Sequence, residues 1–513
     1  KILNQIYLFI LESIHNNLLM LFFKYFHMST KSINSIFQLS KKNMIILILV
    51  GALGIQNLAF QIIFRFNFPY SIDFSDVFSP LFNQIIKDEF SLLVNKGIHV
   101  ILFPKLISYP NFYLNSFDVV NLTYLYWIVM SLTLFVTYLL IRQTDRRLLW
   151  TLIPISAFLY SPLTTSGYWS VGMLAWYFPM LGIISTIYIL NKKNINSKIF
   201  ASGISLTIFS TFSILIGVIS WIAGFLILIK SISEKRLENK KWIILWISSS
   251  LITGFVYLSL TSGLSEPINF DLLFSFSGFS FIANFLSSSF RLKYQTLMIL
   301  VGSLSIILSI IYCWYFIKKD YFKQFFPWFV FLLTAFSGSV ITAIGRLHLE
   351  DHFGNEPYYS PISQLFHIGL ILLTAKILLE YRLNSKTRKQ KIIIVLLLTL
   401  IISQMILLVP SYYSGWQRGE YYFNEKSEFV TCFSLHPDKK CLEVGPMNHD
   451  LKDFIPYFLK FFKKKKLKKF DNWNSNCENF KKNNPIIISK FKKNKKNKLM
   501  DLYYFMDRLG KIS

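Results

Sequence analysis

Asp73 and Asp76 are the side chains whose spacing is best suited to catalysis. They lie in the segment SIDFSDVF, shortly after the first long apolar run. Two carboxylates three residues apart share one face of a helical turn. There they can bind a divalent cation, Mg²⁺ or Mn²⁺, or one of them can take a proton from a hydroxyl group. Ser and Asp are also typical of a helix start, so the spacing alone leaves both interpretations open.

A second group of ionisable side chains occurs in the segment GRLHLEDHFGNEPY. His348 and His352 have the i, i+4 spacing of zinc ligands on a helix, but the HExxH order is absent. Glu350 and Asp351 are weak candidates for a metal site in this segment. Arg346 follows a long apolar run, and its planar guanidinium group suits phosphate recognition. An arginine that only fixes the loop fits the local sequence equally well.

His99 and Lys105, in GIHVILFPKLI, are a further candidate pair for contact with a phosphate. The sequence contains no phosphate-binding Gly-rich loop, no Walker motif and no GxSxG elbow. These observations exclude the common nucleotide-binding and serine-hydrolase patterns.

Long apolar runs must position these residues. The chain has 513 residues, of which 53% are hydrophobic and 16% charged. Runs such as MIILILVGALGIQNLAFQIIF reach the roughly 20 residues that a helix needs to cross a bilayer. This pattern excludes a soluble enzyme and a disulfide-stabilised secreted module, and it predicts an all-α polytopic membrane protein. The net charge of +27 comes mainly from residues between the apolar runs and in the tail, as expected of loops facing anionic lipid.

Eleven transmembrane helices are predicted within a membrane domain of residues 44–410. The predicted spans are 44–64, 119–141, 148–164, 171–190, 199–214, 217–231, 242–262, 294–317, 326–344, 360–380 and 391–410.

Basic residues in the short loops predict the orientation of these spans. With the N-terminus inside, all of the Lys- and Arg-rich loops fall on the cytoplasmic face of the cell membrane. This requires 199–231 to be a tight helical hairpin that turns near Ser213–Gly217. The basic segments are Lys41–Lys42, 142–147, 191–198, 230–241, 318–323 and 381–391.

Two segments on the outer face are apolar but unsuited to span. The first outer loop, 65–118, is expected to form surface helices, and 267–290 is expected to be re-entrant or interfacial. At the N-terminus, residues 1–43 are interpreted as an interfacial helix or as a stretch partly upstream of the true start, with Met28 as a candidate start.

The tail is predicted to lie outside, as a small region over 411–462 followed by a Lys-rich tail over 463–513. A location outside the cell allows a local disulfide between Cys432 and Cys441. Lys and Phe residues alternate in the last part, which fits contact with anionic headgroups or a solvated tail better than nucleic-acid binding.

Acidic residues fall almost wholly in loops, which argues against an ion-coupled transporter with carboxylates inside the membrane. Lys376 is near the inner end of a span and can snorkel there. The other polar residues within spans are interpreted as helix–helix hydrogen bonds. They are Gln56, Asn57, Gln61 and His367.

An Asp pair after the first span, a surface-helix loop and a body of many spans resemble the GT-C superfamily of membrane glycosyltransferases. HVILFPKLISYP resembles the "EHR-x-FFPRL" stretch of a prokaryotic multi-span group of this type. Other similar pieces are SPLTTSGYWSVGMLAWYFPML, ILIGVISWIAG and SVITAIGRLHLEDHFGNEPYYSPISQL.

The resemblance implies transfer of a sugar from a polyprenyl-phosphate carrier to a glycan, lipid or protein acceptor of the cell envelope, on the outer face. It implies that Asp73 and Asp76 act as general base or metal ligands. It also implies that Arg346, His99 and Lys105 hold the carrier phosphate. A polysaccharide polymerase or ligase, and a non-catalytic flippase or transporter of a lipid-linked precursor, are the alternatives.

Overall fold

A computed structural model describes most of the predicted membrane domain. The chain divides into two compact units, Lys1–Ala52 and Leu53–Ser513, and the described part of the first unit is the start of helix α3. All regular secondary structure in the described residues is helical. The described residues are 41–64, 100–107, 120–162, 174–234, 241–261, 270–292, 294–319, 321–346, 354, 356–383 and 387–435.

Eight segments of the described chain are long and apolar enough to cross a membrane. They confirm an all-helical, multi-pass membrane protein, because each carries an apolar run at or near one of the predicted spans. In one of them, a 3-10 turn at Leu215–Val218 leads directly into its α-helix. The helices are α3 (Lys41–Ile63), α6 (Val120–Thr144), α10 (Ile219–Ser233), α11 (Lys241–Leu260), α14 (Gln295–Lys318), α15 (Phe322–Arg346), α16 (Ser360–Leu383) and α17 (Arg388–Leu435).

The other three predicted spans contain shorter helices. Residues 148–164 hold the end of a 3-10 helix, η2 (Arg146–Thr151), and the eight-residue α7 (Leu152–Leu159). Residues 171–190 hold the 17-residue α8 (Leu174–Leu190), and 199–214 hold the 15-residue α9 (Ser197–Thr211). Since these helices are shorter than a full crossing, the count of eleven stays a prediction.

The last helix is longer than predicted. Its apolar run ends near Pro410, but α17 continues to Leu435 as a helix of 48 residues. Trp416 contacts the rings of Phe60 and Phe64 at centroid distances of 5.4 and 5.0 Å. These aromatic contacts hold α17 against the end of α3 beyond the apolar run, where hydropathy alone gives no indication of a helix.

The predicted hairpin between 199 and 231 is present. Helix α9 ends at Thr211, the chain turns through 212–218, and α10 returns beside it. Gly217 packs directly on the Ser210 backbone, and a methyl group there would overlap the Ser210 carbonyl oxygen. Only glycine permits so close an approach of two backbones.

Described residues in or beside four of the basic segments, 142–147, 191–198, 230–241 and 318–323, lie together at one end of the bundle, as the predicted topology requires. Gln143 donates to the Asn191 carbonyl oxygen at 2.7 Å, and Lys230 donates to the Asn191 side chain at 3.2 Å. Gln324, at the start of α15, donates to the Thr144 carbonyl oxygen at 3.2 Å. We call this end, at which α6, α8, α10 and α16 finish, the basic end.

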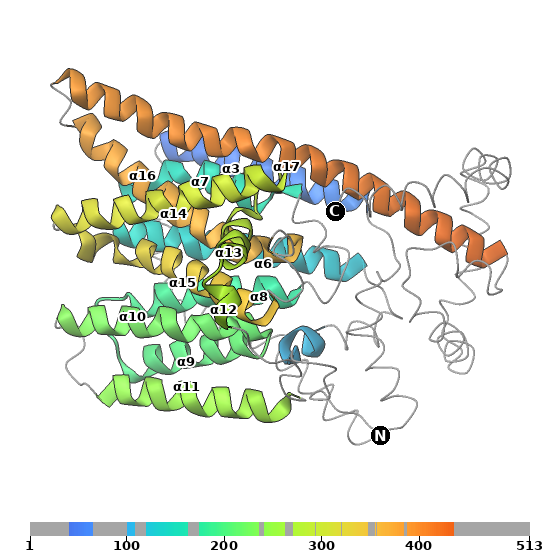
Figure 1. Ribbon diagram of the computed structural model, residues 1–513, viewed down its shortest axis with the longest axis horizontal. Helices are drawn as coiled ribbons and strands as arrows, with labels where there is room; N and C mark the ends of the chain where they lie inside the picture. The colour runs from blue at the N-terminus through green and yellow to red at the C-terminus, as the bar shows by residue number, and fades with distance from the viewer. Residues whose placement is uncertain are drawn as a thin grey trace. The chain divides into compact units, whose positions relative to one another are not determined.

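Two short helices, α12 (Phe270–Leu273) and α13 (Phe276–Ser287), follow α11. Figure 1 shows α13 nearly end-on, while α14, α15 and α16 run across the view, so α13 crosses the direction of the long helices. It packs against all three of them. The described residues 270–290 therefore contain no spanning helix, in agreement with prediction, and the place of 267–290 relative to the membrane surface stays a prediction.

Polar residues inside the bundle join separate elements, as predicted, for two of the four, Asn57 and His367, whereas Gln61 bonds within α3. Asn57 donates to the Tyr160 carbonyl oxygen at 2.8 Å, and Gln61 donates to Asn57 at 2.7 Å. The Nε2 atom of His367 lies 2.8 Å from the carbonyl oxygen of Leu286 in α13. Because a carbonyl oxygen only accepts, this nitrogen carries the proton. The fourth, Gln56, is exposed.

Candidate functional site

Several predicted site residues lie outside the described residues. They are Asp73, Asp76, His99, Glu350, Asp351 and Cys441. Cys432 lies in the last turn of α17, and the predicted disulfide is untested. The described candidates are Arg346 and Lys105.

Arg346 ends α15, where the negative end of the helix dipole favours a cation. Its Nη1 atom donates a hydrogen bond to the Tyr358 hydroxyl at 3.0 Å, and its guanidinium carbon lies 5.6 Å from the centre of that ring. Burial raises the pKa of the Tyr358 hydroxyl, and the guanidinium charge opposes this rise. Among the described residues, Arg346 has no ion pair with a carboxylate. A guanidinium group has five N–H donors, and the described contacts of Arg346 use one of them.

An aromatic cluster fixes Tyr358 in place. The ring of Trp176, at the start of α8, lies 5.3 Å from that of Tyr358 and 5.2 Å from that of Tyr359. Phe285 of α13 lies 4.7 Å from Tyr359, which is fully buried. Four separate elements, α8, α13, the turn before α16 and the end of α15, thus meet around Arg346. We call these residues and Phe281 the aromatic cluster, and their end of the bundle the aromatic end.

The two ends are opposite because α15 connects them. Its Gln324 contacts Thr144 at the basic end, and Arg346 is its last residue. The helix has 25 residues and rises about 1.5 Å per residue, so its ends are roughly a bilayer core apart.

Lys105 is buried, with an exposed fraction of 1%, in the described segment 100–107. This segment packs on the far ends of α9 and α11: the Val100 amide donates to the Tyr257 hydroxyl at 3.0 Å, and the Phe103 ring lies 4.9 Å from Phe209. Different elements therefore hold Lys105 and Arg346, and the described contacts do not bring them into one site.

The described residues on both sides of the 65–99 segment lie at the aromatic end. Before it, Phe64 ends α3 against Trp416 of α17. After it, Val100 contacts Tyr257, near the end of α11 that is remote from the basic loops. The described residues that flank this segment in the sequence thus lie at the same end of the bundle as Arg346.

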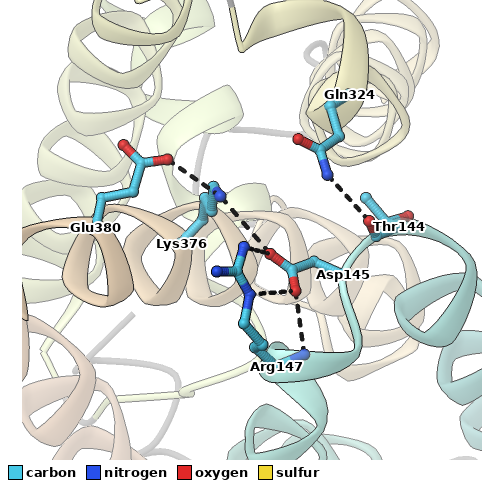
Figure 2. A network of polar contacts seen from close by, with 6 residues as sticks. All are labelled: Thr144, Asp145, Arg147, Gln324, Lys376 and Glu380. Atoms are coloured by element: carbon cyan, nitrogen blue, oxygen red, sulfur yellow. Dashed lines mark hydrogen bonds and ion pairs between the residues drawn. The ribbon is translucent and has the colours of Figure 1, made fainter. Parts of the chain in front are cut away.

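A network of charges occupies the basic end (Figure 2), in which Asp145 and Lys376 are buried and Arg147 is exposed. The Asp145 carboxylate accepts two hydrogen bonds from the Arg147 side chain, at 2.9 and 2.8 Å. It accepts a third from the Arg147 backbone amide at 3.1 Å. The Lys376 amine of α16 lies 3.6 Å from Asp145 and 3.1 Å from Glu380. It also lies 4.8 Å from the centre of the Phe325 ring. This network ties the turn after α6 to α16.

The charges in this network compensate one another. Burial opposes ionisation of Asp145, but the hydrogen bonds and charge of Arg147, with the charge of Lys376, hold the pKa of Asp145 below its ordinary value. Lys376 is 5% exposed. Its position near the helix end would allow it to snorkel, but two carboxylates hold its amine inside the protein instead. We interpret the network as a structural tie and not as a binding site.

Sequence reasoning missed this network because its two parts are far apart in the chain. Glu380 follows Lys376 by one helical turn, and that spacing predicts an ion pair on one face of α16. Nothing in the sequence indicates that Asp145 is the second partner. The useful signal was a lysine inside an otherwise apolar span, which requires a partner when it is buried.

The described residues contain no group of three or more His, Cys, Asp or Glu side chains that could hold a metal ion. The predicted ligands lie outside those residues, so metal binding at Asp73 and Asp76, or at Glu350 and Asp351, stays a prediction.

Fold and geometry define the class of the molecule as an all-helical, multi-pass membrane protein with a half-buried arginine at one end of its bundle. Comparison of the chain with known protein families, curated proteins and solved structures finds no match.

Proposed function

We propose that this chain is a membrane glycosyltransferase that moves a sugar from a polyprenyl-phosphate carrier to an envelope acceptor at the aromatic end. The proposal is based on the surroundings of Arg346. Its guanidinium group is half-buried, and its described partner is a neutral tyrosine. A lipid-linked phosphate has its charge at the membrane boundary and its chain in the hydrocarbon. An arginine at the end of a spanning helix meets that charge at the right depth.

In the proposed reaction, Asp73 or Asp76 takes the proton from an acceptor hydroxyl group. The acceptor oxygen then bonds to the anomeric carbon of the sugar, and the bond from that carbon to the phosphate oxygen breaks. The polyprenyl phosphate leaves with the bonding electrons, and Arg346 stabilises its negative charge. Phe64 and Val100, the described residues on either side of 65–99, lie at the aromatic end, which supports this division of roles.

We further propose that the basic end faces the cytoplasm and the aromatic end faces outward. The clustering of the basic loops supports this orientation through the positive-inside tendency. Reporters fused after residues 196, 236 and 386 should be cytoplasmic, and those after residues 100 and 430 external. An external reporter at 236 would contradict the topology.

A transfer assay tests the proposed reaction. Purified protein is incubated with a panel of polyprenyl-phosphate-linked sugars and envelope acceptors, and labelled product is measured. Asp73→Asn and Asp76→Asn are tested separately, and loss of the general base should lower the rate about 10²–10⁴-fold with an unchanged melting temperature. If both variants retain full activity, the carboxylates only start a helix. Movement of the intact donor across a vesicle membrane without bond cleavage would instead indicate a flippase.

A further inference from the structure

The ring of Tyr358 is held in one position by the side chains around it. It lies 5.3 Å from the ring of Trp176 in α8 and 4.5 Å from that of Tyr359. Tyr359 is fully buried and packs against Phe285 of α13 at 4.7 Å. Because two separate helices support these rings, the Tyr358 hydroxyl is positioned before any ligand binds.

The contact between Arg346 and Tyr358 determines where the hydroxyl proton lies. A guanidinium group carries only donors, so the phenol oxygen accepts from the Nη1 atom at 3.0 Å. The single hydroxyl proton of Tyr358 must then point away from the guanidinium group. Accepting a hydrogen bond from a cation also polarises the O–H bond, which makes it a stronger donor.

The described contacts of the Tyr358 hydroxyl leave this proton without an acceptor. The Tyr359 hydroxyl is buried and makes no hydrogen bond of ordinary geometry with a described residue. Glu356 forms no ion pair with Arg346 among the described contacts. Burial raises the pKa of Tyr358 more than the charge of Arg346 lowers it, so the hydroxyl stays protonated at neutral pH.

We propose that Tyr358 is a second phosphate-binding residue, which donates its hydroxyl proton to the same lipid phosphate group that Arg346 binds. This assignment rests on the proposed function, in which Arg346 holds a lipid-linked phosphate. A phosphate group has several oxygens on one phosphorus atom, so two neighbouring donors can each bond to a different oxygen. The pair lies at the end of α15, a helix long and apolar enough to span, and anionic lipids carry their phosphate at this depth.

Two roles of the Tyr358 hydroxyl can be separated by experiment. If it only holds Arg346 in place, removing it matters only while the guanidinium group is present. If it donates to the phosphate, removing it weakens binding with or without Arg346. A double-mutant cycle of Tyr358→Phe and Arg346→Ala distinguishes the two roles.

The cycle is measured with undecaprenyl phosphate, titrated into the purified full-length protein in nanodiscs of zwitterionic lipid. Undecaprenol, which lacks the phosphate, gives the affinity of the chain alone. Tyr358→Phe retains the ring that packs against Trp176 and Tyr359. The matched control is Tyr312→Phe, because the Tyr312 hydroxyl also forms a buried hydrogen bond, at 2.7 Å to Thr374 between α14 and α16.

Tyr358→Phe should weaken the binding of undecaprenyl phosphate about tenfold, as expected for loss of a hydrogen bond to a charged group. In the Arg346→Ala background the same substitution should still weaken binding about threefold or more. It should leave undecaprenol binding unchanged, and Tyr312→Phe should change neither dissociation constant. Arg346→Gln replaces Arg346→Ala in the cycle if the double variant does not fold.

Three results would overturn the inference: wild-type affinity in Tyr358→Phe, an equal loss in Tyr312→Phe, or a loss that disappears when Arg346 is absent. The proposed function fails separately. If the wild-type protein transfers sugar while Tyr358→Phe keeps its affinity, the inference alone is wrong. Phosphatidic acid, titrated in place of undecaprenyl phosphate, tests the source of the phosphate. Equal affinity with the same dependence on Tyr358 would support the donor role of this hydroxyl and contradict a polyprenyl carrier.

Discussion

The two ends of the bundle differ in how their charges are partnered. At the basic end, Lys376 lies between Asp145 and Glu380, and an arginine completes a neutral set. At the aromatic end, Arg346 has a neutral tyrosine as its described partner. A closed set of ion pairs holds helices together, whereas a half-buried cation beside a neutral partner suits an anion from outside the chain. Substitutions at the first end should therefore change stability, and those at the second should change binding.

The largest effect on stability is expected for Lys376→Met. The variant leaves Glu380 without its amine and Asp145 with Arg147 alone. Removing one partner from a buried ion pair costs about 3–5 kcal/mol, so the free energy of unfolding should fall by roughly 3 kcal/mol. Urea or thermal unfolding in detergent measures the change.

Lys319→Met is the matched control for this substitution, because Lys319 is exposed at the same end. It should change the free energy of unfolding by less than about 0.5 kcal/mol. Equal stability of the two variants would show that the buried network contributes nothing to the fold.

A smaller loss, of about 1–3 kcal/mol, is expected for Gly302→Ala. The added methyl group would overlap the Ala283 carbonyl oxygen and push α13 away from α14. Gly254→Ala is the control, since no atom lies within 4 Å of a methyl group at Gly254 in α11. Thermal unfolding of both variants decides the point: a Gly302→Ala protein as stable as Gly254→Ala would contradict the close packing of α13.

The long helices could be predicted from sequence because the length of an apolar run is a local property. The run at 391–410 predicts α17, and the run at 44–64 predicts α3. The extension of α17 to Leu435 could not be predicted, because it depends partly on contacts between Trp416 and α3. Hydropathy indicates that a helix segment avoids water, but it does not indicate which other helix the segment packs against.

The site was predictable only in part, for the same reason. The position of Arg346 at the end of an apolar run makes it a candidate phosphate-binding residue from sequence alone. Its neighbours Trp176 and Phe285 come from helices far apart in the chain, and no short pattern connects them. The sequence shows that Lys376 lies within a span, but its ion pair with Asp145 depends on how α6 and α16 pack.

The smallest effect on stability is expected for Asp145→Asn, and it should depend on pH. The folded-state pKa of Asp145 is below its ordinary value of 3.8. Its stabilising effect is therefore fully present above about pH 4 and is lost as the pH falls through the lower folded-state pKa. At pH 7 the variant should be less stable by about 1–2 kcal/mol.

Unfolding of wild type and Asp145→Asn is compared from neutral pH to below pH 4. The difference between the two proteins should shrink as the pH falls. A difference that stays constant over this range would mean that the Asp145 charge is not stabilised by Arg147 and Lys376.

The most direct test of the contrast between the two ends is a sugar-transfer assay of the Arg346→Ala variant with a polyprenyl-phosphate donor. The rate is measured on variant protein that keeps the wild-type melting temperature. Loss of a cation that stabilises the leaving phosphate should lower the rate about 10²-fold or more, and Arg346→Lys should retain part of the activity. An Arg346→Ala protein that transfers sugar at the wild-type rate would contradict the proposal that the aromatic end is the catalytic end.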